Sequence, residues 1–148
     1  MPDTPEHNKP ETLLAFDFGH RRIGVAIGQQ ITASANPLGA AANGPAGPDW
    51  SQISRWMDEW NPDRLVVGLP LHADGTPSDL SRDALVFVAQ LGRYGRPVET
   101  VDERYTSLEA KELLKRERQT GRRGRIRKEM IDAAAAVLIA ERWFAQIS

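Results

Sequence analysis

The sequence predicts one α/β domain in which a mixed five-stranded sheet is flanked by helices. Three apolar segments come first, and the first two form a hairpin; helical and strand segments then alternate toward the end of the chain. A meander followed by such alternation is typical of a mixed sheet covered by helices. At 148 residues the chain is long enough for one domain with a sizeable core. We expect that domain over residues 12–148.

Each expected strand is a short apolar run or shows alternation with period two. The expected strands span residues 12–18, 23–27, 31–38, 64–68 and 97–101. Between the third and fourth of these, residues 39–48 are rich in glycine, alanine and proline, and they are expected to form a loop.

The expected helices follow residues that favour helix starts. They span residues 50–60, 77–91, 105–117 and 128–146. Asp49 is a suitable N-cap for the first helix, which should end at Asn61-Pro62. Thr76 is expected to cap the second helix, with Pro77 as its first residue. Residues 119–127 contain two glycines and four arginines, so we expect a mobile loop there.

The composition excludes several classes of protein. The chain has no cysteine, which excludes disulfides and thiolate metal sites, and it has no run of roughly 18 apolar residues of the kind that spans a membrane. Residues 1–11 lack the apolar core of a signal peptide and are expected to form a disordered tail. A cytoplasmic protein without membrane contact is therefore expected.

The near-zero net charge conceals a strong asymmetry. Residues 111–128 contain nine Lys or Arg and two Glu, a local charge of +7, whereas the remainder carries −8. A basic segment on an acidic protein is typical of contact with a nucleic-acid backbone. The alternative is a solvated helix end with a loop.

Three carboxylates on separate elements form a candidate catalytic site. Asp17 shares strand parity with Leu13 and Ala15, so it is expected to face inward among apolar side chains. Glu103 follows the last strand, and Asp132 lies near the start of the last helix, on its apolar face. The alanine run 133–136 should let that helix lie close to the sheet.

Converging acids of this kind indicate a divalent metal ion. Three inward carboxylates would repel each other unless a cation lay between them, and carboxylates with few other ligands suit Mg²⁺ or Mn²⁺. Such a site activates water for in-line attack on a phosphodiester. Each acid also has a structural explanation: Asp17 as a turn acceptor, Glu103 as a partner of Arg21 or Arg104, and Asp132 at a helix N-terminus.

Four segments together resemble the YqgF family, also called RuvX. They are 17–26 (DFGHRRIGVA), 68–76 (GLPLHADGT), 102–106 (DERYT) and 128–134 (KEMIDAA), and they occur in the family's order. The resemblance implies an RNase H-like fold related to RuvC and a bacterial cytoplasmic nuclease that matures the 5′ end of pre-16S ribosomal RNA. It also implies that Asp17, Glu103 and Asp132 are the catalytic acids.

The leading hypothesis is a divalent-metal-dependent nuclease that acts on structured RNA, alone or within a pre-ribosomal particle. Asp17, Glu103 and Asp132 would hold the metal, and specificity would come from RNA shape. Basic residues near the hairpin turn, after the last strand and in the basic segment would bind phosphates. They are Arg21, Arg22, Arg104, Arg122, Arg123, Arg125, Arg127 and Lys128.

Three alternatives remain open. A Holliday junction resolvase would cut branched DNA and would require a symmetric homodimer, whereas an RNA nuclease can be a monomer. A non-catalytic ribosome-assembly factor would bind RNA without cutting it. An ATP-dependent phosphoryl transferase shares the Asp-x-Gly hairpin, but it needs two domains, and this chain has room for one.

Overall fold

A mixed sheet of six strands, in the order β4-β3-β2-β1-β5-β6, forms the middle layer of the structure. The structure is a computed structural model that describes residues 10–72, 74–102 and 128–147. The strands are β1 (Thr12–Phe18), β2 (Arg22–Gln29), β3 (Ser34–Gly44), β4 (Gly47–Pro48), β5 (Arg64–Leu69) and β6 (Val98–Asp102). β1 to β4 form an antiparallel meander, and β5 and β6 are parallel to β1.

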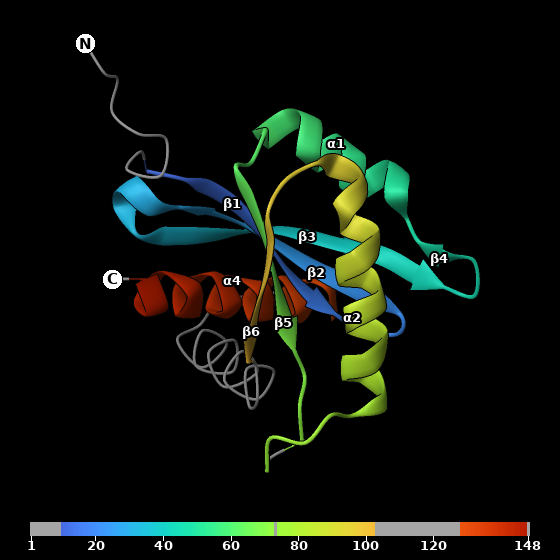
Figure 1. Ribbon diagram of the computed structural model, residues 1–148. Helices are drawn as coiled ribbons and strands as arrows, with labels where there is room; N and C mark the ends of the chain where they lie inside the picture. The colour runs from blue at the N-terminus through green and yellow to red at the C-terminus, as the bar shows by residue number, and fades with distance from the viewer. Residues whose placement is uncertain (1–9, 73, 103–127, 148) are drawn as a thin grey trace, which may run out of the picture.

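Helices cover both faces of this sheet (Figure 1). They are α1 (Trp50–Trp60), α2 (Asp79–Leu91) and α4 (Lys128–Ile147), with short 3₁₀ turns η2 (Gln30–Thr32) and η3 (Gly92–Tyr94). α1 and α2 lie on one face, and α4 crosses the other face. The prediction of a mixed sheet flanked by helices is confirmed. No helix in the described part of the chain is long and apolar enough to cross a membrane.

Strand parity decides which core each residue of β1 joins. Leu14, Phe16 and Phe18 pack with α1 and α2, whereas Leu13 and Ala15 pack with α4. Asp17 therefore belongs to the α4 face, as its parity predicts.

The predicted loop over residues 39–48 is wrong. β3 continues to Gly44, and the two-residue β4 pairs with its end, so the sheet has six strands and not five. β3 pairs with β2 from Ser34 to Ala42, whereas β4 pairs only with Asn43 and Gly44, which leaves an edge along most of β3. Pro37 is tolerated there because an edge strand need not donate every N–H, and Gly39 has a φ of +144°, a conformation that residues with a side chain rarely adopt.

The start of the second helix also differs from the prediction. α2 is capped by Ser78, whose side chain accepts from the Ser81 amide while the Ser81 side chain accepts from the Ser78 amide. Thr76 is already engaged, because its amide and its hydroxyl both donate to Asp74, at 2.9 and 2.7 Å. α1 begins and ends as predicted, with Asp49 as its N-cap and Asn61 as its C-cap.

Several predictions lie outside the described residues. They concern most of the N-terminal tail (1–9), the helix over 105–117 and the mobile loop over 119–127. From the end of the expected tail, Glu11 accepts two hydrogen bonds from Arg64, at 2.8 and 3.2 Å. This contact joins the chain to the start of β5.

Candidate active site

The hairpin of β1 and β2 places Asp17 between two glycines. In the sheet, Asp17 lies opposite Gly24 of β2 on one side and beside Gly68 of β5 on the other. Neither neighbour has a side chain, so the half-buried Asp17 carboxylate is not crowded by its cross-strand partners.

Asp132 is brought to the same place by the close approach of α4 to β2. A Cβ atom added to Gly24 would collide with the backbone carbonyl of Asp132 and would lie 2.8 Å from its Cβ. Directly opposed residues of an antiparallel pair have Cα atoms about 4.5–5.5 Å apart, so Asp132 sits against the immediate strand neighbour of Asp17. Two predicted acids that are far apart in the sequence thus share one small region.

Small residues make this approach possible. The α4 face of β2 carries Gly24, Ala26 and Gly28 in succession, and α4 contributes the buried Ala133, Ala135 and Ala136. The alanine run was expected to allow close packing. The matching glycines on β2 were not identified from the sequence, although small residues at every second position of one strand are a readable signal.

Arg22 makes a direct ion pair with Asp132. Its Nε donates to Asp132 Oδ2 at 2.8 Å, and the two side chains are 30% and 23% exposed, respectively. Arg22 stands two residues before Gly24 in β2, so both point toward α4. The contact of Arg22 with a substrate phosphate stays a prediction. In the structure, Arg22 pairs with Asp132, one of the predicted catalytic acids.

The turn between β1 and β2 is held from the opposite face of the sheet. Asn43 donates through its backbone N–H to the Arg21 carbonyl and through Nδ2 to the Gly19 carbonyl, at 2.8 and 2.7 Å. The Arg21 side chain is exposed. It is thus accessible for the predicted phosphate contact, which stays a prediction.

The remaining predicted site residues lie outside the described side chains. They are Glu103, Arg104, Arg122, Arg123, Arg125, Arg127 and Lys128, the last of which begins α4. β6 ends at Asp102, immediately before Glu103. Within the described residues no three His, Cys, Asp or Glu side chains group as a metal site. Asp17 and Asp132 supply the hard oxygen donors that Mg²⁺ and Mn²⁺ prefer, and a complete set requires another ligand.

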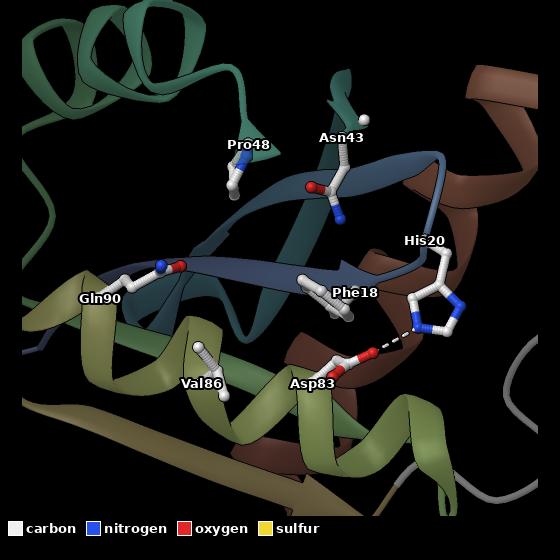
Figure 2. Close-up of a pocket in the computed structure, with 8 residues that line it drawn as sticks. Phe18, His20, Asn43, Pro48, Asp83, Val86 and Gln90 are labelled. Atoms are coloured by element: carbon white, nitrogen blue, oxygen red, sulfur yellow. Dashed lines mark hydrogen bonds and ion pairs between the residues drawn. The ribbon is translucent and has the colours of Figure 1, made fainter. Parts of the chain in front are cut away.

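A cleft of about 250 Å³ opens on the α1 and α2 face (Figure 2). Its lining residues are Phe18, His20, Asn43, Gly44, Pro48, Asp83, Val86 and Gln90. At one end His20 Nε2 lies 2.7 Å from Asp83 Oδ2. This cleft has one carboxylate, already paired with His20, and no Lys or Arg in its lining. It is therefore a poorer match to a phosphodiester and a divalent cation than the α4 face.

Comparison with known proteins identifies the family. The RuvX family profile, described as Holliday junction resolvase, matches residues 11–146. A protein of Chromohalobacter salexigens named "Putative pre-16S rRNA nuclease" is 49% identical over 90% of this chain and 88% of its own length. A protein of Azotobacter vinelandii with the same name is 46% identical over 93% and 95%, respectively.

Two solved structures that share this fold are Holliday junction resolvases. RuvC of T. thermophilus, in complex with a Holliday junction substrate, matches with a TM-score of 0.54 at 16% identity, over 92% of this chain and 95% of its own. The fowlpox virus Holliday junction resolvase matches with a TM-score of 0.52 at 12% identity, over 91% and 99%. At such identities the likeness concerns the fold alone, and it confirms the expected RNase H-like architecture.

Proposed function

The chain belongs to the RuvX family, and we propose that it is a divalent-metal-dependent nuclease of the cytoplasm that processes the 5′ end of pre-16S ribosomal RNA. The observation that carries the proposal is the meeting of Asp17 and Asp132 across Gly24. A carboxylate on a strand and one on a helix converge where the neighbouring strand positions carry no side chain. This is the arrangement that a cation and a phosphate need.

Asp17, Asp132 and Glu103 are the proposed ligands of Mg²⁺ or Mn²⁺. Asp17 faces α4, and Asp132 lies on α4 itself. Glu103 is proposed as the third ligand because it directly follows β6 in the sequence. When bound, the metal supplies Lewis-acid polarisation of the phosphate and lowers the pKa of a water molecule.

The chain's own residues would bind and orient the substrate around these acids. Arg21 is exposed on the turn beside Asp17, and Arg22 lies between that turn and Asp132. Guanidinium groups bind phosphate oxygens through paired N–H donors, so both can hold the backbone next to the scissile bond. Arg104, Arg122, Arg123, Arg125, Arg127 and Lys128 extend this basic surface in the proposal.

RNA is the preferred substrate in this proposal because the relatives of nearly half-identical sequence bear the name of a pre-16S rRNA nuclease. The sequence contains no recognisable base-reading motif, and RNA shape would provide specificity. A pre-ribosomal particle is then a natural partner, since it would present the precursor end in one conformation.

Cleavage of branched DNA is the second candidate function. It is favoured by the family's description and by the fold shared with two resolvases, one of them bound to a Holliday junction. Two coordinated cuts would require a homodimer with two active sites. A strict monomer in solution would count against it.

The test offers the full chain two substrates, a pre-16S 5′-end RNA and a four-way DNA junction. Each is incubated with Mn²⁺, with Mg²⁺ and with EDTA, beside Asp17→Asn. Metal-dependent cutting of the RNA alone, lost in Asp17→Asn while RNA binding persists, supports the proposal. Cutting of the junction alone replaces it with the resolvase. Cutting that persists in EDTA or in Asp17→Asn rejects the metal site.

A further inference from the structure

The Arg22–Asp132 ion pair places a cation on a carboxylate that the proposed metal also needs. Arg22 Nε lies 2.8 Å from Asp132 Oδ2, and both side chains are mostly shielded from water. An ion pair at this distance takes up much of the negative charge that a carboxylate offers to a metal ion. Arg22 and the metal therefore compete for the same charge.

The backbones on both sides of the pair are fixed, so the competition can be resolved only by side-chain motion. Arg22 is anchored in β2, which pairs with β1 and β3. The Asp132 backbone rests on Gly24 with no space for even a methyl group between them. The Asp132 carboxylate and the Arg22 guanidinium can rotate, whereas α4 and β2 cannot separate without losing their packing.

We propose that Arg22 is a positioning residue that holds the Asp132 carboxylate when no cation is bound and releases it when the metal binds. The inference rests on the proposed function, because it takes Asp132 as a metal ligand. It adds a coupling: the guanidinium that leaves Asp132 becomes available to a substrate phosphate only once the metal site is loaded. Arg22 then links metal binding to substrate binding.

The expected consequence is that loss of Arg22 tightens metal binding. The metal can bind only those molecules in which Arg22 has released Asp132. The apparent affinity for the metal is therefore reduced in proportion to the fraction of molecules in that released form. For a half-buried pair, removing both the competitor and its positive charge should strengthen Mn²⁺ binding about three- to tenfold. A purely structural Arg22 would give the opposite result, because an unanchored Asp132 would bind Mn²⁺ more weakly.

The test is a calorimetric titration of the full chain with Mn²⁺, without RNA. Arg22→Gln should bind Mn²⁺ about three- to tenfold more tightly than the wild type. Arg21→Gln is the matched control. It removes the same charge from the neighbouring residue, whose side chain is exposed, and it should change the Mn²⁺ affinity less than about twofold. Equal or weaker binding by Arg22→Gln overturns the proposal.

In a second measurement the metal titration is carried out on the wild-type protein, and a variant serves only to assign the resonance. The Arg22 Nε–H resonance is followed during a Mg²⁺ titration and assigned by its loss in Arg22→Lys. It should shift in proportion to Mg²⁺ occupancy as the bond to Asp132 is released. A resonance that stays in place while Mg²⁺ binds overturns the proposal.

Asp132→Asn separates failure of this inference from failure of the proposed function. If Asp132→Asn loses Mn²⁺ binding while Arg22→Gln binds no more tightly than the wild type, the metal site stands and the role of Arg22 falls. If Asp132→Asn binds Mn²⁺ as the wild type does, or if the wild type binds none, both fall.

Discussion

The two faces of the sheet are built from residues of very different size. Under α1 and α2 the core is aromatic: Phe87 lies between Phe16, Phe18 and Trp50, with ring centroids 5.3–5.7 Å away. Under α4 the contact is made of glycine and alanine, and Asp132 rests directly on Gly24. Large side chains hold a helix away from a sheet, whereas small ones let the two backbones meet. The difference explains why carboxylates of a helix and a strand converge on the α4 face.

The same difference assigns separate tasks to the two faces. The aromatic face buries large apolar area and contributes most to stability. The α4 face pairs Arg22 with Asp132 and sets Asp132 against Gly24, the strand neighbour of Asp17. Changes in side-chain size should therefore affect the two faces differently.

The largest loss of stability should come from the aromatic face. Phe87→Ala removes a ring that is 1% exposed and leaves a cavity, so the free energy of unfolding should fall by about 3–5 kcal/mol. Urea unfolding measures this loss. Mn²⁺ affinity of the folded fraction should not change, because no proposed ligand lies on that face. A change in Mn²⁺ affinity would show that the faces are not independent.

Adding one methyl group should damage the α4 face. In Gly24→Ala the new Cβ would collide with the Asp132 backbone, which cannot rotate away, so we expect a loss of about 3 kcal/mol. α4 should shift and carry Asp132 away from Asp17, with loss of Mn²⁺ binding.

Gly28→Ala is the matched control for Gly24→Ala. Its Cβ would meet only side-chain atoms, Leu13 Cδ1 at 3.0 Å and Phe144 Cζ at 3.1 Å, so a loss of about 1 kcal/mol is expected. Mn²⁺ binding should be retained. Equal effects of the two substitutions, measured by urea unfolding and calorimetry, would contradict the special role of the contact at Gly24.

The smallest effect is expected at Asp74, in the loop between β5 and α2. Hydrogen bonds from the Thr76 hydroxyl and amide lower the pKa of Asp74 below its ordinary value of 3.8. Because the pKa of Asp74 is lower in the folded protein, the stabilisation from these hydrogen bonds is complete above the ordinary pKa. It is lost as the pH falls through the pKa of the folded state. Asp74→Asn should lower the hydrogen-exchange protection of the Thr76 amide at pH 6 and leave global stability unchanged. A large global loss would contradict this local role.

The hairpin, α1 and the inward Asp17 could be predicted because their signals are local. The alternation of side chains along the chain predicts β1 and β2. Asp49 and Asn61 cap the two ends of α1 through contacts within a few residues. β3 could not be predicted in full, because the glycine, alanine and proline residues of segment 39–48 indicate a loop until the strand is known to lie near an edge. Thr76 was wrongly predicted as the cap because its hydroxyl donates to Asp74 instead. Composition does not reveal which of two neighbouring hydroxyl residues will cap the helix.

The site shows the same division between local and distant signals. The inward faces of Asp17 and Asp132 follow from strand and helix periodicity. The Arg22–Asp132 pair joins residues 110 positions apart, so no local pattern shows that these two side chains meet. Strand parity gives Arg22 the face of Gly24, whereas Arg21 precedes the strand.

One acid from each face of the sheet can be compared in a single cleavage assay. If catalysis belongs to the α4 face, Asp132→Asn and Asp83→Asn should differ when they are assayed beside the wild type on the pre-16S 5′-end RNA with Mn²⁺. Asp132→Asn should reduce the cleavage rate about a hundredfold or more, because it removes a proposed metal ligand. Asp83→Asn, which breaks only the pair with His20 beside the opposite cleft, should cut at the wild-type rate. Wild-type cleavage by Asp132→Asn, or loss of cleavage in a folded Asp83→Asn, would contradict the account.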